Sequence, residues 1–178
     1  MSSKATIFYT RLLETAPRLK LDYKENAGID LYPDISKISV ISYEDGAKIT
    51  FQDDSVVFTV HYVPFVVSIS SPYKIAFPQS VHGIIYGRSG NFFKRGIDVF
   101  KGVIDSSYRG EIGVGLIFNK TGVFRISNAT AIAQLVMIPF GNCDYELVEV
   151  DNDYFERELS KTSRGEKGFG STGYVKEG

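Results

Sequence analysis

The sequence predicts an all-β sandwich or barrel. Short runs of β-branched and aromatic residues alternate with period two, and regular turn signals separate them at Asp45-Gly46, Asp53-Asp54 and Lys120-Thr121-Gly122. No long segment shows a sustained helical period, and only Asn91–Arg95 is predicted to form a short turn of helix. The 178 residues suffice for one hydrophobic core, without a repeat or a dividing linker.

The predicted strands are short apolar runs bounded by turn or polar residues. In chain order they are Thr6–Leu12, Gly28–Tyr32, Ser39–Ser42, Lys48–Phe51, Val56–Val60, Phe65–Ser70, Lys74–Phe77, Gly83–Gly87, Ile97–Val99, Gly102–Ile104, Glu111–Asn119, Val123–Ile126, Ala131–Pro139 and Tyr145–Glu149. Beyond Asp151 hydrophobicity falls and charge rises. We therefore expect residues 1–150 to form the β domain and 151–178 an extended arm that ends on a neighbouring subunit, the alternative being a disordered tail.

Composition narrows the classes of function. The formal net charge is −1 and the isoelectric point about 6.1, which argues against a general nucleic-acid or membrane-surface binder. One cysteine, Cys143, and two distant histidines, His61 and His82, exclude a disulfide framework and argue against zinc, so any metal is expected to be a hard cation such as Mg²⁺. The N-terminus carries no targeting pattern and no stretch reaches membrane-spanning length, so we expect a soluble intracellular protein, cytoplasmic or nuclear.

The segment from Arg164 to Gly173 combines four glycines, two hydroxyls, an arginine and an aromatic ring. Glycine lets backbone N–H groups approach an anion, and arginine offers a planar, permanently charged donor fork, so this segment fits closure over a polyphosphate. It is not a P-loop, because Ser171 stands where the lysine is required. The alternative is a flexible tail with a chance cluster of glycines.

A second segment, Gly102 to Gly113, reads as a hairpin with Asp105 at its bend and Tyr108 facing back over the same pocket. Such a hairpin offers backbone groups to a planar base, and Asp105 could accept a proton from an attacking water. The alternative is an ordinary turn aspartate that bonds its own backbone.

Three weaker signals lie elsewhere. The loop Arg88-Ser89-Gly90 could bind phosphate or be a plain surface turn. Asp30, within an apolar run, is either a solvated edge residue or a partner to a metal-bound water. Gln134 lies inside a core-like strand and needs a hydrogen-bond partner, which could be backbone or ligand.

Taken in order, these segments resemble the five motifs of the trimeric dUTPase family. They are Gly28-Ile-Asp30-Leu, Arg88-Ser89-Gly90, Gly102-Val-Ile-Asp105-x-x-Tyr108-Arg-Gly110, Ile132-Ala-Gln134-Leu and Arg164-Gly-x-x-Gly168-Phe-Gly-Ser-Thr172-Gly. The third and fifth match nearly residue for residue. The resemblance implies a jelly-roll-like β fold, a homotrimer with an exchanged arm and shared active sites, and hydrolysis of dUTP to dUMP and pyrophosphate with Mg²⁺.

The resemblance also implies roles for single residues. Asp105 would orient and deprotonate the water that attacks the α-phosphorus, Tyr108 would exclude a 2′-hydroxyl, and Asp30 would contact a water on the magnesium. The hairpin backbone would read uracil, Phe169 would stack on it, and the remaining polar residues would hold the phosphates. The implied substrate-binding set is Arg88, Ser89, Gly90, Gly102, Val103, Ile104, Tyr108, Gly113, Gln134, Arg164, Phe169, Gly170, Ser171 and Thr172.

The chain departs from the family pattern at three places. Gly87 replaces a proline, so the loop that follows is expected to be looser, and Ala129-Thr130-Ala131 replace Gly-Asp-Arg, which puts the local turn in doubt. Residues 39–60 form an additional predicted hairpin, which could pack on the trimer surface, bind a partner or be a tolerated insertion.

Two rival functions stay open. A non-catalytic dUTP-binding regulatory protein would keep the pocket and lose turnover. A dCTP deaminase, which is similar in fold and in the Arg-Ser loop, would need a glutamate near the position of Gly115.

Overall fold

The computed structural model describes residues 3–21, 27–139 and 143–166 and confirms the all-β class. Its strands are β1 (Ser3–Arg11), β2 (Ile29–Leu31), β3 (Ile38–Val40), β4 (Ala47–Gln52), β5 (Ser55–Val60), β6 (Phe65–Ala76), β7 (Val81–Tyr86), β8 (Ile97–Val99), β9 (Val103–Ile104), β10 (Glu111–Phe118), β11 (Gly122–Ser127), β12 (Ala133–Pro139) and β13 (Cys143–Glu149). Short helical segments are η1 (Glu44–Gly46), η2 (Asn91–Arg95), α1 (Asn152–Tyr154) and η3 (Phe155–Leu159). None of the helices in these ranges is long and apolar enough to cross a membrane.

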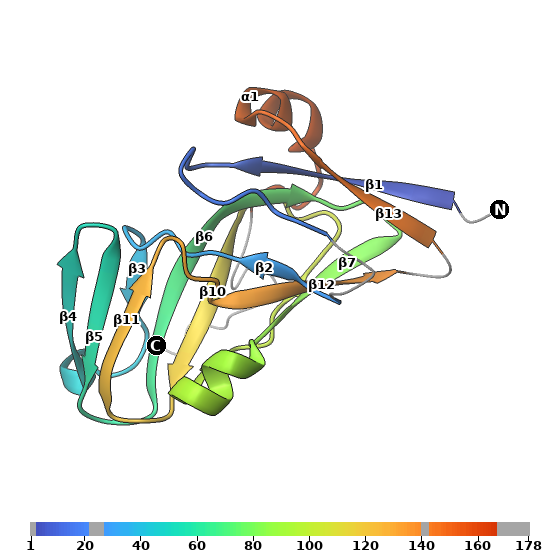
Figure 1. Ribbon diagram of the computed structural model, residues 1–178. Coiled ribbons are helices and arrows are strands. Elements are labelled where there is room, and N and C mark those ends of the chain that lie inside the picture. The colour runs from blue at the N-terminus through green and yellow to red at the C-terminus, as the bar shows by residue number, and fades with distance from the viewer. Residues whose placement is uncertain (1–2, 22–26, 140–142, 167–178) are drawn as a thin grey trace, which may run out of the picture.

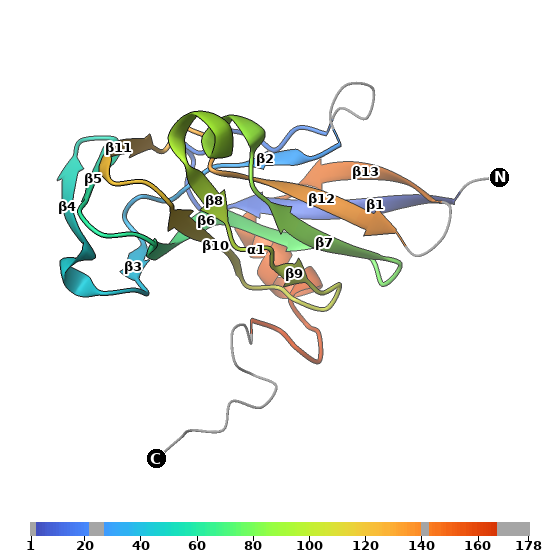
Figure 2. The ribbon, with the colours of Figure 1, turned by 90° about the horizontal axis from the view of Figure 1, so that it is seen from below.

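The strands form three sheets (Figure 1). The largest has the order β13-β1-β6-β10-β8, with β3 paired to β6 off this path. The second has the order β2-β12-β7-β9, and the third is β11-β5-β4. Figures 1 and 2 both show the third sheet at one end of the molecule and the start of β1 at the other.

Strand β6 is the centre of the largest sheet, because β1, β3 and β10 all pair with it in antiparallel register. Its inward residues, among them Phe65, Val67 and Ile69, are no more than 1% exposed. The neighbouring strand β10 shows the same alternation of buried and partly exposed residues from Ile112 to Phe118. This two-residue period buries one face of each strand, as the sequence pattern predicts.

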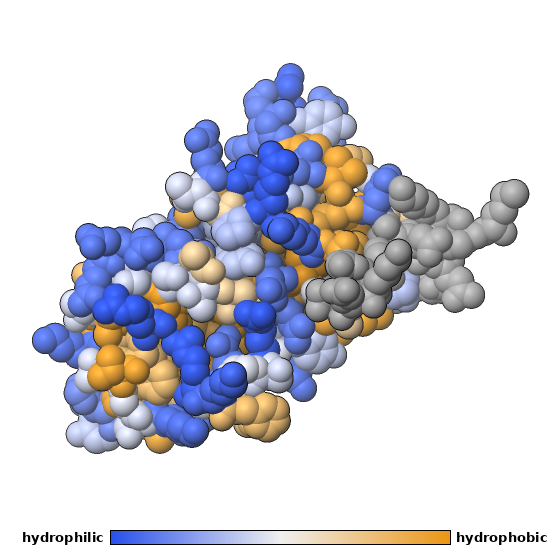
Figure 3. All heavy atoms as spheres, viewed as in Figure 1, coloured by the Kyte–Doolittle hydropathy of each residue, from blue (hydrophilic) through white to orange (hydrophobic). Residues whose placement is uncertain are grey.

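Residues 39–60 contain the end of β3, the turn η1 and the β4–β5 hairpin, to which β11 adds a third strand. Phe58 from this hairpin is fully buried, with its ring centroid 5.1 Å from Phe118 and 6.5 Å from Phe65. The inner face therefore shares the main core. Other apolar side chains here, including Tyr43 and Phe51, are exposed, and Figure 3 shows apolar patches among polar residues at this end.

Strand β6 runs unbroken where two strands, Phe65–Ser70 and Lys74–Phe77, were predicted. Pro72 suggested a break because proline cannot donate to the ladder. The register with β10 shifts at this point, so Ile112 faces Ser71 and Glu111 faces Lys74. The bulge leaves Pro72 outside this ladder, while its carbonyl accepts from Leu12 N–H at 2.9 Å.

The first part of the predicted arm is helical rather than extended. The Asp151 carboxylate accepts a hydrogen bond from Tyr154 N–H at 2.7 Å and caps α1. Phe155, at the start of η3, is fully buried. One buried aromatic side chain and one cap thus fold residues 152–159 onto the body, a pattern too short to give a helical period in the sequence.

Glu149 ties the two terminal strands together, since β1 and β13 pair in parallel. Its carboxylate accepts from Arg11 Nε at 2.8 Å and from the Tyr9 hydroxyl at 2.9 Å. Burial raises the pKa of Glu149, but these hydrogen bonds outweigh it and leave the pKa below its usual value. Burial and the bond to Glu149 together raise the pKa of Tyr9 to about 12.

We predict that Glu149→Gln lowers the free energy of unfolding by about 2 kcal/mol at pH 7, because it weakens charged hydrogen bonds. A carboxylate with a lowered folded pKa stabilises the fold above its unfolded pKa, about 4.3, and loses this contribution as pH falls through the folded value. Urea unfolding at pH 7 and pH 2.5 tests this. The difference between the proteins should be largest at pH 7, and an equal difference at both pH values contradicts the assignment.

Candidate functional site

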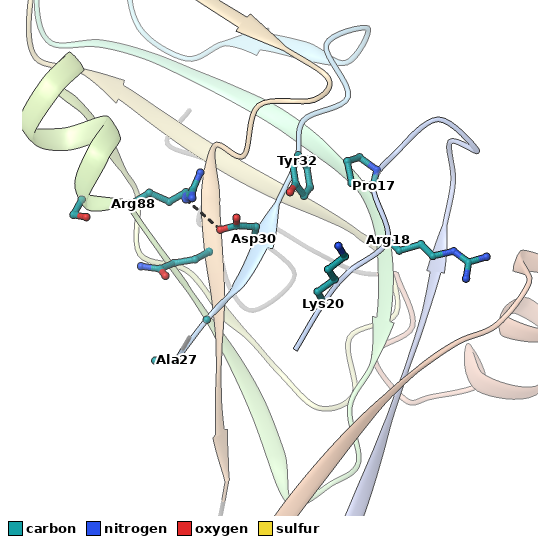
Figure 4. A pocket seen from close by; sticks show the side chains of 10 residues that line it. Pro17, Arg18, Lys20, Ala27, Asp30, Tyr32 and Arg88 are labelled. Carbon is teal, nitrogen blue, oxygen red and sulfur yellow. Dashed lines mark ion pairs between the residues drawn. The ribbon is translucent and has the colours of Figure 1, made fainter. Parts of the chain in front are cut away.

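A pocket of about 580 Å³ brings together Asp30, Arg88, Ser89 and Gln134 of the predicted site. Strand β12 lies between β2 and β7, so Gln134 faces Asp30 on one side and Tyr86 on the other. The loop that follows β7 then carries Arg88 over the same space, as Figure 4 shows. Three sequence segments that are far apart thus meet through strand pairing alone.

Close contacts fix the geometry of this pocket. Arg88 Nε lies 3.1 Å from Asp30 Oδ1, with both side chains 41% exposed. Gln134 Nε2 donates to the Gly87 carbonyl at 2.9 Å, which holds the start of the Arg88 loop. Gly28 packs tightly against Gln134, because a Cβ there would lie 2.8 Å from Gln134 Oε1 and would force that side chain to move. The partner required by Gln134 is therefore backbone, and one face of the pocket stays polar.

The altered fourth motif keeps a closed turn. The Thr130 N–H donates to the Ser127 carbonyl at 3.0 Å, and the two hydroxyls lie 2.9 Å apart. Arg88 and Asn91 both donate to the Ala131 carbonyl, at 3.3 and 3.4 Å. The change from Gly-Asp-Arg to Ala-Thr-Ala therefore leaves Gln134 in its strand, and it removes one negative and one positive charge, so the net charge of the motif is unchanged.

The hairpin after β9 carries the second group of predicted residues. The Tyr108 N–H donates to the Asp105 carbonyl at 3.0 Å, and the Tyr108 hydroxyl donates to the Glu111 carbonyl at 2.8 Å. The ring lies so close to Gly110 that a Cβ there would be 2.4 Å from the hydroxyl oxygen. The Asp105 side chain is 50% exposed, and Val103 is 62% exposed. The hairpin thus presents a carboxylate and free backbone edge to solvent.

The described part of the arm lies along this hairpin. Arg109 N–H donates to the Gly165 carbonyl at 2.9 Å, and the Gly165 backbone, at φ +54°, forms a bridge with Tyr108. Arg164 pairs with Asp105, and its guanidinium lies 5.6 Å from the Tyr108 ring centroid. The residues Phe169, Gly170, Ser171 and Thr172 lie outside the described ranges.

Lys74, on β6, is the anchor of the arm. Its ammonium pairs with Glu156 at 2.7 Å and with Glu166, although its side chain is only 12% exposed. Burial lowers the pKa of Lys74, but the two carboxylates outweigh this and raise it. Burial, with Glu166 and Glu111 nearby, likewise raises the pKa of Tyr108. Both groups therefore keep their usual protonation at neutral pH.

Arg109 was not among the predicted site residues, yet it joins the hairpin to the arm. It is 8% exposed, and its guanidinium donates to the carbonyls of Ser106, Tyr108 and Leu159 at 2.6 to 2.7 Å. Burial lowers its pKa. Its place beside Tyr108 in the third motif was the only signal in the sequence.

The two groups of predicted residues lie at different levels of one sheet. Gln134 pairs with Tyr86, at the end of β7, whereas Ile104 pairs with Gly83. Because β9 is antiparallel to β7, the next residue, Asp105, lies at the level of His82. Four residues separate the levels of His82 and Tyr86, which is roughly 13 Å at about 3.3 Å per residue. Gly102 lies between the groups, with its carbonyl accepting from Ile85 N–H at 2.9 Å, and Gly113 faces Ser70.

A family model described as dUTPase matches residues 46–173. The chain belongs to the dUTPase family. The match begins after Asp30, so the first motif lies outside it, but the pairing of β2 with β12 sets Asp30 directly beside Gln134. The matched range includes the segments that carry Gly90, Asp105, Gln134 and Arg164.

Curated relatives carry the name deoxyuridine 5′-triphosphate nucleotidohydrolase. The protein from Candida albicans is 39% identical over 105 residues, covering 59% of this chain and 62% of that protein. Those from Arabidopsis thaliana and vaccinia virus are 40% and 42% identical and are covered over 58% and 65% of their lengths. The chain thus spans about three fifths of the length of the curated relatives it matches.

Solved structures share the jelly-roll-like fold. A dUTPase from phage phi11 of S. aureus matches with a TM-score of 0.54 at 18% identity, over 80% of this chain and 95% of that chain. The dUTPase of Staphylococcus bacteriophage 80alpha matches with a TM-score of 0.53 at 18% identity, over the same shares of the two chains.

We predict that Arg109→Lys loosens the arm and lowers the free energy of unfolding by about 2 to 4 kcal/mol, because a lysine cannot serve three buried carbonyls in fixed directions. Hydrogen exchange measured by mass spectrometry should show that the variant exchanges faster than the wild type in residues 151–166, whereas exchange in β12 changes less. Lys101→Arg, at an exposed position, serves as the control. Unchanged exchange in the arm contradicts the role given to Arg109.

Proposed function

We propose that the protein hydrolyses dUTP to dUMP and pyrophosphate as a homotrimer whose sites combine groups from different protomers. The observation that carries this is the offset of roughly 13 Å between the level of Asp105 and that of Gln134 along one sheet. Reacting atoms must meet within about 3.5 Å. This offset supports a site in which the phosphate pocket of one protomer meets the hairpin of a second, an arrangement that a closed symmetric ring supplies.

In this mechanism the Asp105 carboxylate accepts a proton from the attacking water. The water oxygen bonds to the α-phosphorus, the bond from that phosphorus to the bridging oxygen breaks, and pyrophosphate leaves with the electron pair. Half exposure and the hairpin bend suit Asp105 to this role. Its pairing with Arg164 has to open as nucleotide enters, which frees the guanidinium for the γ-phosphate.

The hairpin and arm would recognise the nucleoside. The backbone of Gly102, Val103, Ile104 and Gly113 would bond the uracil edge, with no space for the methyl group of thymine. The Tyr108 ring, fixed against Gly110, would pack on deoxyribose and exclude a ribose hydroxyl. Phe169 would stack on the base.

The pocket and the glycine-rich end would hold the phosphate chain. Arg88, Ser89 and Gln134 line the pocket and would supply a cation, a hydroxyl and an amide on one side. Gly90, which follows Ser89 in the chain, does not line the pocket in the free protein and would contribute its backbone N–H. The other side of the phosphate chain would be covered by Arg164, Gly170, Ser171 and Thr172. Exclusion of bulk water strengthens each of these charged contacts.

The residues present fit a magnesium ion carried in with the nucleotide. The described ranges hold no group of three or more His, Cys, Asp or Glu side chains that could bind a metal by themselves. Mg²⁺ usually keeps several waters and uses phosphates with one or two carboxylates, which suits Asp30 acting through water. When bound, the ion would neutralise charge on the phosphates. One phage phi11 neighbour coordinates a structural Mg(II) ion.

The same features argue against the rival functions. Strand β10 carries no carboxylate beyond Glu111, so the glutamate that a dCTP deaminase requires is not at Gly115. A regulator that only binds dUTP would not need a general base such as Asp105 at the bend of the hairpin. If the substrate is free dUTP, we expect the protein to act inside the cell and to need neither a nucleic acid nor a membrane as partner.

The direct test follows pyrophosphate release from dUTP, dCTP, dTTP and UTP, with and without Mg²⁺. We expect turnover of dUTP at least 100-fold above the others, because lost polar contacts to base and sugar discriminate strongly, by up to about 10⁴-fold. Ammonia released from dCTP supports the deaminase. Tight dUTP binding without turnover supports the regulator.

We predict that Asp105→Asn lowers kcat by about 10²- to 10⁴-fold while KM changes little, because it removes the general base and keeps the shape. Asp98→Asn, a carboxylate in β8 outside the predicted site, is the matched control and should behave like the wild type. Undiminished turnover of Asp105→Asn removes that residue as the base.

A further inference from the structure

We propose that Lys20 binds the phosphate chain of the nucleotide in the pocket of Asp30, Arg88 and Gln134. Lys20 belongs to none of the five motifs, yet it lines this pocket together with Pro17, Arg18 and Tyr32. The identity of the ligand as a nucleotide rests on the proposed function, whereas the choice of Lys20 rests on the geometry of the pocket.

The segment that carries Lys20 is pinned to the body. The Tyr73 hydroxyl donates to the Pro17 carbonyl at 2.7 Å, and Arg11 donates to the Ala16 carbonyl at 2.9 Å. Leu19 is 6% exposed, and Leu21 packs against the core. The neighbours of Lys20 on both sides are turned to the core, whereas Lys20 is exposed and lines the pocket.

The direction of the side chain agrees with this. Figure 4 shows the Lys20 ammonium turned to the space beside Asp30 and Tyr32, while Arg18 extends away from Asp30. Arg18 is also held by Glu149, 3.4 Å from its Nε. Of the two basic side chains outside the motifs, Arg18 and Lys20, it is therefore Lys20 that is placed to contact a ligand in the pocket.

Charge in the pocket points to an anionic ligand. Arg88 is paired with Asp30 and Arg18 with Glu149, whereas Lys20 makes no ion pair within residues 3–21, 27–139 and 143–166. Ala131 carries no charge beside this pocket. An ammonium without an ion pair in the described ranges, at a polar wall, is the arrangement that a polyphosphate neutralises.

The experiment measures the Kd of deoxyuridine, dUMP, dUDP, the non-hydrolysable analogue dUpNHpp and inorganic tripolyphosphate for the wild type, Lys20→Met, Lys20→Arg and the control Lys48→Met. Lys48 is an exposed lysine on β4, in the third sheet. We expect Lys20→Met to raise the Kd of dUpNHpp about 5- to 10-fold, and that of dUMP less, because a partly exposed charged contact is lost. Lys20→Arg should restore most of the affinity, and Lys48→Met should match the wild type.

Two further readouts separate binding from structure. The midpoint of thermal unfolding without ligand should be equal in all four proteins, since Lys20 is exposed. In turnover, Lys20→Met should raise KM for dUTP with kcat nearly unchanged, and this effect should shrink at high salt.

The outcomes distinguish this inference from the proposed function. If the wild type hydrolyses dUTP and Lys20→Met matches Lys48→Met for every ligand, the role of Lys20 is wrong and the function stands. If the wild type does not turn over dUTP but Lys20→Met weakens binding of dUpNHpp or inorganic tripolyphosphate, the function is wrong and the phosphate site stands. Equal weakening for deoxyuridine, or no binding of any of these probes, overturns the role of Lys20.

Discussion

Antiparallel pairing of β7 with β12 on one side and β9 on the other sets the distance between the pocket residues and the Asp105 hairpin. The first pairing puts Gln134 beside Asp30 and the Arg88 loop. The second starts the hairpin at the opposite end of the same strand. Because the register is fixed by buried side chains, neither group can slide toward the other without turning core residues to solvent.

Strand β6 of the largest sheet connects the hairpin, the arm and the pocket segment. Strand β6 pairs with three strands and also carries Lys74, the buried ammonium that anchors the arm through Glu156 and Glu166. The hydroxyl of Ser71, on the same strand, donates to the Tyr32 carbonyl at 2.6 Å and so joins β6 to the pocket segment. The core strand therefore supports hairpin, arm and pocket together.

The additional segment 39–60 is part of this framework on its inner side. Phe58 lies among the rings of Phe65 and Phe118, so the hairpin cannot be removed without opening the core. This burial makes the inner side of segment 39–60 part of the core, and none of its residues lines the pocket of Asp30 and Arg88.

Much of the fold could be predicted from the sequence, because alternating apolar residues mark strands such as β5, β10 and β11 directly. The continuity of β6 could not, since Pro72 signals a break and only the partner strand supplies the bulge. The helical turn near Phe155 was also missed, because a single buried ring and an Asp151 cap give no periodic pattern.

Within the site, the motif residues could be predicted, but their separation along the sheet could not. Registers such as Gln134 with Tyr86 depend on long-range pairing that local patterns do not encode. Lys20 and Arg109 were missed for a related reason. Lys20 lies in an irregular segment without a motif, and Arg109 acts through carbonyl groups of residues distant in the chain.

The central claim is that the catalytic carboxylate and the phosphate pocket of one working site come from different protomers. The most direct measurement co-expresses Asp105→Asn with Arg88→Gln, two variants that should each be inactive alone, and assays the mixed oligomers. Random assembly leaves about a quarter of sites with both groups native, so about a quarter of wild-type turnover should return. A mixture no more active than the average of the two variants would contradict the account.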